Sequence, residues 1–131
     1  MASTRENRMV FLDANCLMTL LYLRPKAKVV ADCVGNVSAH VAISVLTVHL
    51  IYHFGLKDGY SFKKITSLLD SYQILPIDRE VVKLAQSQFI TKDFEDCLQA
   101  ACAEIGDCDE IITLDKKFKK YSGTKLKVIL L

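Results

Sequence analysis

Short apolar runs, each followed by a polar residue and an amphipathic segment, constrain the fold of this chain more than any other feature. The first run, residues 8–12, is too short for a helix and apolar on successive positions. Such a run predicts a strand that is buried on both faces of a sheet. Similar runs predict further strands at 39–43, 73–77, 110–114 and 127–131.

The segments between these runs have helical periodicity, and four of them end at glycine or proline. Helices are predicted near residues 13–25, 27–34, 44–55, 60–69, 78–87 and 96–105. Strands that alternate with helices indicate an α/β protein, a three-layer α/β/α sandwich with a mostly parallel central sheet. No linker or repeat interrupts the pattern, so residues 8–131 are predicted to form a single domain after a polar N-terminal tail, residues 1–7.

Composition excludes several other classes of protein. The chain has 131 residues, 51% of them hydrophobic and 24% charged, which fits neither a disordered tail nor a coiled coil. The net charge of +2 is too small by itself to indicate nucleic-acid binding. No apolar run approaches the roughly 18 residues of a membrane span. With five irregularly spaced cysteines and a polar start, the sequence predicts a soluble cytoplasmic protein with free thiols.

Carboxylates stand where the predicted strands end. Asp13 follows the first strand and Asp115 follows the strand at 110–114, while Asp93, Glu95 and Asp96 begin a helix. Parallel strands open their carboxyl ends onto one edge, so these acids are expected to meet there. Carboxylates held close together repel one another, and a hard divalent cation such as Mg²⁺ or Mn²⁺ relieves that repulsion. Such an ion can activate water for attack on a phosphoryl group.

Helix capping is the alternative explanation of each acid. Aspartate before a helix is a favoured N-cap, worth about 1 kcal/mol, and capping suffices for any one of these residues. Two acids at the ends of neighbouring strands are harder to explain by capping alone. The sequence pattern alone does not decide between helix capping and metal binding.

Four ordered motifs resemble the PIN domain, and within it the small VapC-like toxins of toxin–antitoxin pairs. They are FLDAN at 11–15, Ile43-Ser44, DFEDCLQAA at 93–101, and IITLD at 111–115 followed by Lys117-Phe118. The resemblance covers residues 8–131 and implies a metal-dependent ribonuclease that uses Mg²⁺ or Mn²⁺. It implies an acidic metal-binding and catalytic cluster of Asp13, Asp96 and Asp115. It also implies that these acids are oriented by hydrogen bonds from Asn15, Ser44 and Thr113.

Several other residues are assigned roles less directly. Asp93 is either an outer partner of the cluster or a helix cap, and we prefer the cap. Lysines beyond Asp115 are solvated surface charges or, beside an acidic metal site, a rim that gathers RNA phosphates. These lysines are Lys116, Lys117, Lys119 and Lys120. Tyr121 and Phe118 are candidates for base stacking, although Phe118 suits a core position better.

The resemblance also implies partners. VapC-like proteins cleave RNA, bind a cognate antitoxin and commonly form homodimers, and their helices corresponding to 27–34 and 60–69 form a groove for an antitoxin segment. The predicted function is therefore an endoribonuclease that is the toxin of a type II toxin–antitoxin pair, with no membrane association.

The helix after Ser44 departs from the family pattern. The family places an acid there, usually glutamate, whereas this chain has Leu50, or His49 in a register shifted by one residue. His49 is an alternative Mn²⁺ ligand, and with His53 it has a spacing that suits zinc. The loss of one acid also supports a second prediction: a catalytically impaired PIN-domain binding or regulatory module.

Overall fold

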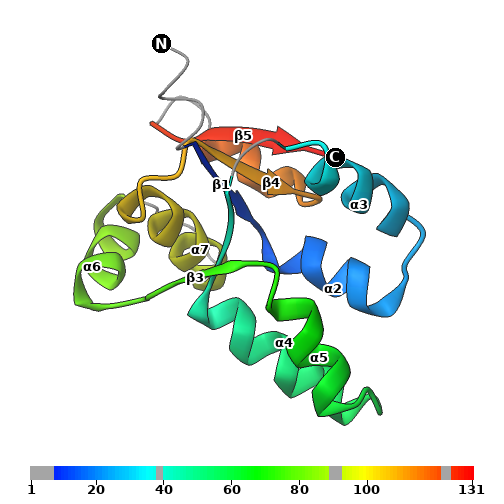
Figure 1. Ribbon diagram of the computed structural model, residues 1–131. Helices are drawn as coiled ribbons and strands as arrows, with labels where there is room; N and C mark the ends of the chain where they lie inside the picture. Colours follow the sequence, from blue (N-terminus) through cyan, green and yellow to red (C-terminus); the bar gives the residue numbers. More distant parts are fainter. Residues whose placement is uncertain (1–7, 38–39, 89–92, 122–124) are drawn as a thin grey trace.

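The computed structural model describes residues 8–37, 40–88, 93–121 and 125–131, and its strands form one parallel five-stranded sheet (Figure 1). Each predicted strand is present, in the order β3-β2-β1-β4-β5. This confirms the predicted α/β fold with a mostly parallel sheet. The strands are β1 (Met9–Leu12), β2 (His40–Ser44), β3 (Gln73–Leu75), β4 (Glu110–Thr113) and β5 (Lys127–Leu130).

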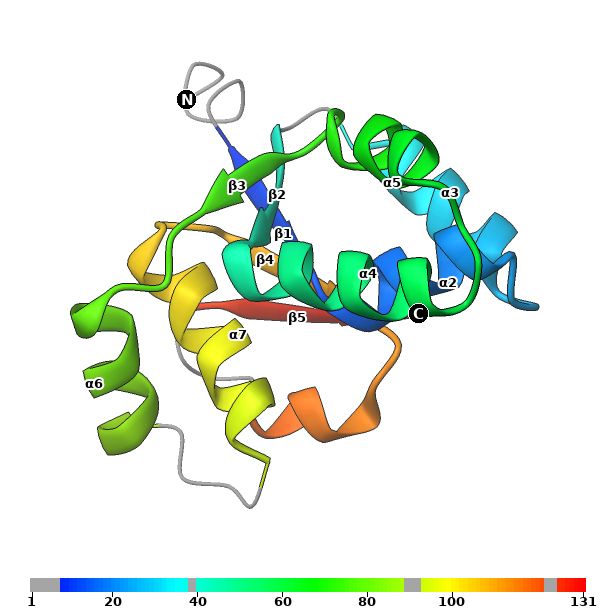
Figure 2. The same ribbon diagram turned by 90° about the horizontal axis from the view of Figure 1, so that it is seen from below.

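Helices cover both faces of the sheet, which makes three layers (Figures 1 and 2). One face carries α2 (Ala14–Tyr22), α3 (Ala27–Gly35), α4 (Val45–Lys57) and α5 (Phe62–Leu69). The other carries α6 (Arg79–Gln88), α7 (Phe94–Ile105) and the 3₁₀ helix η1 (Lys116–Tyr121).

Alternate strand residues explain why the strands are apolar at successive positions. Phe11 and Ile111 pack towards α6 and α7, whereas Val10, Leu12 and Ile112 pack towards α2–α5. Successive side chains of a strand point to opposite faces, so a sheet covered on both faces needs apolar residues at nearly every position. Two cores result, one on each side of the sheet.

Several element boundaries differ from the sequence prediction, and three of these differences have a clear physical reason. β3 ends at Leu75 instead of 77, because Pro76 has no N–H to donate to the ladder. α7 begins at Phe94 rather than Asp96, because Asp93 is its N-cap. α4 continues through Gly55, which was predicted to end it, as far as Lys57. The predicted tail, residues 1–7, and residue 39 of the predicted second strand lie outside the described residues.

Close packing explains why position 55 is a glycine, and the residue does not end the helix. A Cβ built on it lies 2.8 Å from Ile65 Cδ1 and 3.2 Å from Leu21 Cδ2, so the glycine lets α4 approach α5 and α2. Gly35, at the end of α3, has nothing within 4 Å of a Cβ built in the same way, and it offers a matched comparison.

Gly55→Ala is expected to lower the free energy of unfolding by about 1 kcal/mol, because overpacking outweighs the gain in helix propensity. Gly35→Ala is expected to leave it unchanged or to raise it slightly. Urea denaturation of both variants measures the difference. Equal stability of the two variants would contradict the close approach of the helices.

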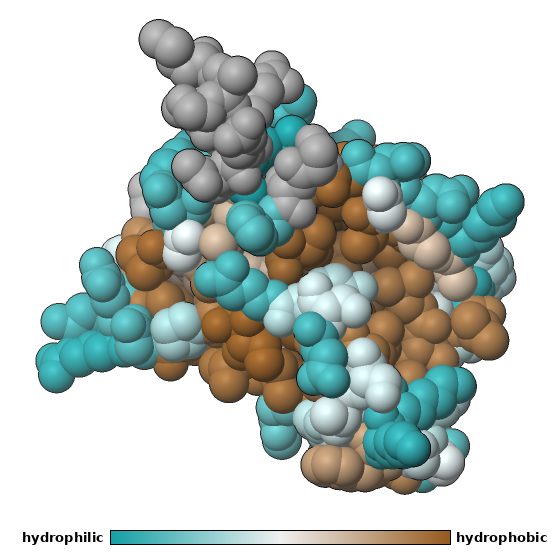
Figure 3. Space-filling view, in the orientation of Figure 1, coloured by the Kyte–Doolittle hydropathy of each residue, from teal (hydrophilic) through white to brown (hydrophobic). Residues whose placement is uncertain are grey.

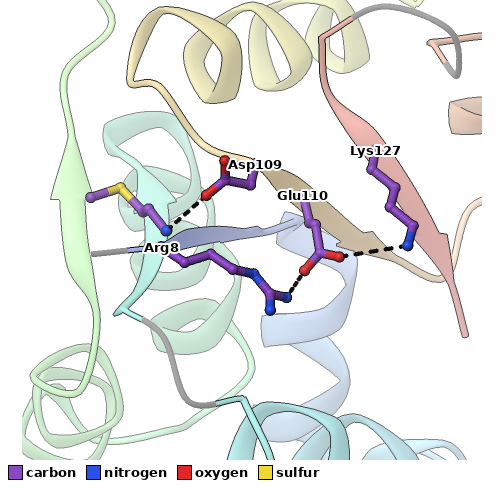
Figure 4. Close-up of polar contacts among 5 residues, drawn as sticks. Arg8, Asp109, Glu110 and Lys127 are labelled. Carbon is purple, nitrogen blue, oxygen red and sulfur yellow. Dashed lines mark hydrogen bonds and ion pairs between the residues drawn. The ribbon is translucent and has the colours of Figure 1, made fainter. Parts of the chain in front are cut away.

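At the amino edge of the sheet, acids are paired with bases (Figure 4). Glu110 forms ion pairs with Arg8 and, at 3.9 Å, with Lys127, and Asp109 Oδ2 accepts a hydrogen bond from the backbone N–H of Met9 at 3.3 Å. These contacts join the starts of β1, β4 and β5. The acids at this edge are thereby neutralised or hydrogen-bonded.

The sequence analysis also predicted free thiols and no membrane-spanning segment. All five cysteines are free, and Cys16, Cys97, Cys102 and Cys108 are buried as small apolar residues. Within the described segments, no helix is both long enough and apolar enough to span a bilayer.

Candidate metal centre at the carboxyl edge of the sheet

The strand order places a switch point between β1 and β4. The chain moves from β1 through β2 to β3 on one side, then returns to β4 and β5 on the other. In open α/β sheets, ligands bind beyond the carboxyl ends of the strands at such a point. Asp13 directly follows β1, and Asp115 stands two residues after the end of β4.

Asp13 is buried and held by two hydrogen bonds. Its Oδ1 accepts from the backbone N–H of Ala14 at 2.8 Å, and its Oδ2 accepts from the hydroxyl of Thr113 at 2.9 Å. Thr113 Oγ1 in turn accepts from the backbone N–H of Asp115 at 3.0 Å. Thr113 therefore connects two acids that lie far apart in the sequence. Asp13 also caps α2, so capping and a place in the acidic cluster are compatible.

Asp96 enters from α7 with one oxygen unsatisfied. The residue is only 8% exposed, and its buried Oδ2 accepts no hydrogen bond from the described residues. Most buried polar atoms in native proteins have a partner, so an orphaned carboxylate oxygen calls for an explanation. A cation at this position provides one.

The pKa values of Asp13 and Asp96 report how the acids affect one another. Burial raises the pKa of Asp13 to about 6, with the charges of Asp115 and Glu95 adding to the rise and the two hydrogen bonds opposing it. Burial likewise raises the pKa of Asp96 to about 7, and the charges of Asp93, Asp13 and Asp115 add to it. The three predicted cluster acids are thus within range of one another's charge.

These residues fit a hard divalent cation by their charge and chemistry. Carboxylate oxygens are the ligands that Mg²⁺ and Mn²⁺ prefer. Asp13, Asp96 and Asp115 form no ion pair with a described base, in contrast to the acids at the amino edge. No three His, Cys, Asp or Glu side chains in the described part of the chain stand in a ready-made ligand arrangement. The three acids therefore affect one another's charge at one edge of the sheet, but they do not form a complete set of metal ligands as they stand.

Ser44 does not bond an acid, in contrast to the expectation. Its Oγ donates to Gln99 Oε1 at 2.7 Å and accepts from the backbone N–H of Thr47 at 3.1 Å as the N-cap of α4. Gln99 Nε2 donates to Thr47 Oγ1 at 2.9 Å, which completes a buried network between α4 and α7. Because this cap and network occupy the hydroxyl, Ser44 contacts α7 and not the acids.

Gln99 is the residue that sequence reasoning missed. It lies three residues after Asp96, hence on the same side of α7, and it is 1% exposed. Its bonds to Ser44 and Thr47 fix the turn of α7 that carries Asp96. The available signal was one amide among the alanines and cysteines that follow Asp96.

The remaining candidates lie at the rim of the cluster. Asn15 is exposed, while Asp93 accepts from the backbone N–H of Asp96 at 3.4 Å and therefore caps α7. Lys117 lies 4.0 Å from Asp93 and lowers the pKa of Asp96. The predicted basic residues of η1 are all exposed: Lys116, Lys117, Lys119 and Lys120.

The aromatic and histidine candidates differ in burial. Phe118 and Tyr121 are both buried, with ring centroids 5.4 Å apart, so Tyr121 is a core residue and not a stacking platform. His49 and His53 are exposed on α4, with stacked rings 5.6 Å apart. No third ligand joins them within the described residues.

Comparison with known proteins agrees with this architecture. No curated protein matches the chain in sequence. A toxin–antitoxin complex from Klebsiella pneumoniae is similar in structure, with a TM-score of 0.71 and 20% identity over 89% of this chain and 94% of the other. VapBC-1 from nontypeable Haemophilus influenzae gives 0.72 and 18%, over 93% and 97% of the two chains.

The third similar structure is VapC20 from Mycobacterium tuberculosis, a toxin that cleaves the sarcin–ricin loop. Its TM-score is 0.70 at 8% identity, over 90% of this chain and 98% of the other. At such identities the likeness shows a common fold. The sequence itself matches the family model of the PIN domain over residues 10–123. This chain therefore belongs to the PIN domain family.

Proposed function

We propose that this protein is a metal-dependent endoribonuclease that hydrolyses RNA phosphodiester bonds and is the toxin of a type II toxin–antitoxin pair. The observation that carries the proposal is the unsatisfied, buried Oδ2 of Asp96 beside two further acids, Asp13 and Asp115. Their mutual repulsion is what a divalent cation relieves. VapC20, a structural neighbour, is a toxin that cleaves the sarcin–ricin loop.

The chain's own residues would hold and orient such a cation. Asp13, Asp96 and Asp115 are its proposed ligands, with Thr113 holding Asp13 and Gln99 fixing the turn of α7 that carries Asp96. When bound, Mg²⁺ or Mn²⁺ lowers the pKa of water and stabilises negative charge on a phosphoryl oxygen. Hydrogen bonds of this kind keep ligand carboxylates aimed at the ion.

Substrate binding is assigned to the basic rim of η1. Its exposed lysines follow Asp115 directly, and one of them, Lys117, lies close enough to affect Asp96. Lysine contacts to phosphates position a nucleic acid without reading its sequence, and their strength falls with salt.

The proposed partners are a cognate antitoxin and a second copy of the chain. Structural neighbours include a toxin–antitoxin complex, and two others, VapBC2 from Rickettsia felis and FitAB, are bound to DNA fragments. A hollow of about 510 Å³ lies between α3 and the segment that follows α5, and it includes Ala31 and Val34 from the first of the two helices predicted to form an antitoxin groove but no residue of the second, 60–69. Figure 3 shows apolar side chains gathered on the side of the molecule that carries α2 and α3. Phe54, Leu56 and Phe62 add exposed apolar area on α4 and α5.

One observation favours a second candidate function, a catalytically impaired binding module. The half-buried Leu50 of α4 stands where the resemblance places an acid, and α4 contains no carboxylate. Such a module would bind RNA or its partner without cutting.

A cleavage assay in Mn²⁺ with structured and unstructured RNA separates the two candidates. Wild type is expected to cleave, and Asp13→Asn and Asp115→Asn are expected to lose about a hundredfold or more of the rate while remaining folded. Glu80→Gln, an exposed change on α6, is the control and should cleave normally. RNA binding without cleavage by wild type under every divalent ion would favour the binding module. Unchanged rates in both aspartate variants would refute the assigned roles.

A further inference from the structure

Basic side chains are concentrated in two segments of the layer formed by α2–α5. Residues 22–28, which end α2 and begin α3, and residues 57–64, which end α4 and begin α5, contain six bases and one acid. The whole chain, in contrast, has 17 bases and 15 acids. All six bases are exposed: Arg24, Lys26, Lys28, Lys57, Lys63 and Lys64. Such a local excess of positive charge is typical of a surface that binds an anionic polymer.

Aromatic rings bring the two segments together. The rings of Tyr22 and Tyr60 lie edge to face, with their centroids 5.2 Å apart, where the end of α2 faces the turn between α4 and α5 (Figure 1). The guanidinium carbon of Arg24 lies 5.2 Å from the ring centroid of Tyr22. On the other side, the ammonium nitrogen of Lys64 lies 5.0 Å from the ring centroid of Tyr60. These four residues form a continuous row, which we call the α2–α5 patch.

The two cations of the patch are held in place without being neutralised. A cation over the face of a tyrosine ring is attracted to the ring but keeps its charge. Neither Arg24 nor Lys64 forms an ion pair with a carboxylate of the described residues. Asp58, the one acid in the two segments, accepts a hydrogen bond from the hydroxyl of Tyr22. Both cations therefore remain able to bind an anion from solution.

The loop that carries Arg24 lies at the carboxyl edge of the sheet. Lys26 Nζ donates a hydrogen bond to the carbonyl of Leu131, just beyond β5, at 3.2 Å. The N–H of Leu131 donates to the carbonyl of Thr113 at 2.9 Å, and the hydroxyl of Thr113 donates to Asp13. The loop after α2 is therefore at the same edge as the proposed metal centre.

The outer face of α2 runs from the metal centre to the patch. Asn15, Met18 and Tyr22 follow one another at spacings of three and four residues, so they share one face of the helix, and each is at least partly exposed. α2 contains no carboxylate that would repel a phosphate along this face. Asp13 caps the helix and Tyr22 ends it, so the distance along the axis is about 14 Å. That length corresponds to about four stacked nucleotides.

We propose that the α2–α5 patch binds the phosphate backbone of RNA about four nucleotides away from the bond that the metal centre cleaves. The inference rests on the proposed function, because it assumes that RNA is the substrate. Arginine and lysine contacts to phosphates add affinity without reading the bases, so the patch contributes to RNA binding and not to the chemical step. RNA is favoured over an acidic peptide because the acid-free face of α2 leads from the patch to the acids that would cut it.

The test is the binding of a labelled single-stranded RNA of about 20 nucleotides, longer than a typical single-strand site. Fluorescence anisotropy in EDTA, over a range of salt concentrations, measures binding without cleavage. Arg24→Gln/Lys64→Gln is expected to weaken binding about tenfold. It should also reduce the slope of log affinity against log salt by about 1.4, since each lost phosphate contact accounts for about 0.7.

Arg79→Gln/Lys83→Gln is the matched control. It also removes one exposed arginine and one exposed lysine, but from α6, on the other face of the sheet. It should bind RNA within about twofold of wild type and keep the same salt slope, because a remote charge contributes little at physiological salt. Arg24→Lys/Lys64→Arg keeps both charges in the patch and should also bind like wild type. Melting temperatures show whether each variant is folded.

Cleavage in Mn²⁺ gives a second measurement. Arg24→Gln/Lys64→Gln is expected to raise KM about tenfold and to leave kcat unchanged, because the patch holds RNA equally well before and during the reaction. Loss of RNA binding in this variant alone, in a protein that cleaves RNA with no divalent ion, would support the patch and overturn the nuclease.

Other outcomes would overturn the patch while leaving the metal centre intact. One is an equal loss of RNA binding in the two glutamine variants, or no loss in either. Another is a polyglutamate peptide that binds wild type and loses affinity in Arg24→Gln/Lys64→Gln while RNA binding is unchanged. That result would assign the patch to an acidic protein partner.

Discussion

Asp96→Asn is expected to abolish RNA cleavage and, at the same time, to stabilise the metal-free protein at neutral pH. The wild-type carboxylate is buried, surrounded by Asp93, Asp13 and Asp115, and has an oxygen without a partner among the described residues. These features raise its pKa to about 7, so its ionisation in the folded protein costs free energy. An amide of the same shape carries no charge and is not repelled. We expect a gain of about 4 kcal/mol, or about 14 °C in melting temperature.

Urea denaturation at pH 7.5 in EDTA measures this gain, and cleavage in Mn²⁺ measures the loss, which should be about a hundredfold or more. Asp32→Asn, an exposed change on α3, is the control and should alter stability by less than about 0.5 kcal/mol. Saturating Mn²⁺ should then stabilise wild type but not the variant. A variant that is less stable than wild type in EDTA would show that the carboxylate is held by favourable contacts, contrary to the structure.

The metal-free protein is expected to lose stability as the pH rises from about 4 to about 7. The folded-state pKa values of Asp13 and Asp96, about 6 and about 7, are above those of an unfolded chain. Between these limits the folded protein binds more protons than the unfolded one, so the free energy of unfolding falls with rising pH. The rise of about two units for Asp13 corresponds to about 3 kcal/mol. Asp107, whose pKa is lowered by Lys125, acts in the opposite direction, but this exposed pair contributes little.

Mn²⁺ is expected to remove or reverse this decline, because a cation binds the deprotonated carboxylates and competes with protons. Urea midpoints between pH 4.5 and 8, with EDTA and with Mn²⁺, measure both profiles. In Asp96→Asn the decline in EDTA should be shallower and confined to lower pH, since the contribution of Asp96, which has the highest of these pKa values, is lost. A metal-free protein whose stability rises steadily across this range would contradict the repulsion among the acids.

Local patterns were sufficient to predict most elements of the fold. Apolar runs of four or five residues predicted each strand, because a sheet covered on both faces needs such residues, and helical periodicity predicted each helix. Gly55 shows where the local interpretation failed. A glycine near the end of a helical pattern is typical of a helix stop, but its contacts with Leu21 and Ile65 belong to the packing of α4 on its neighbours. Sequence pattern alone does not distinguish these two reasons for a glycine.

In the candidate site, too, some features could be predicted from the sequence and others depend on the tertiary structure. The sequence alone determined that Asp13 and Asp115 follow strands. It also determined that they would lie at one edge of the sheet, because parallel strands run in the same direction and therefore end at the same edge. Only the tertiary structure decided the strand order that makes β1 and β4 neighbours, the hydrogen bond from Thr113 to Asp13, and the network that joins Gln99 to Ser44. It also decided that Asp96 is buried with one oxygen unsatisfied. These features depend on contacts between residues 55 to 100 positions apart, and such contacts arise from packing, which no local pattern encodes.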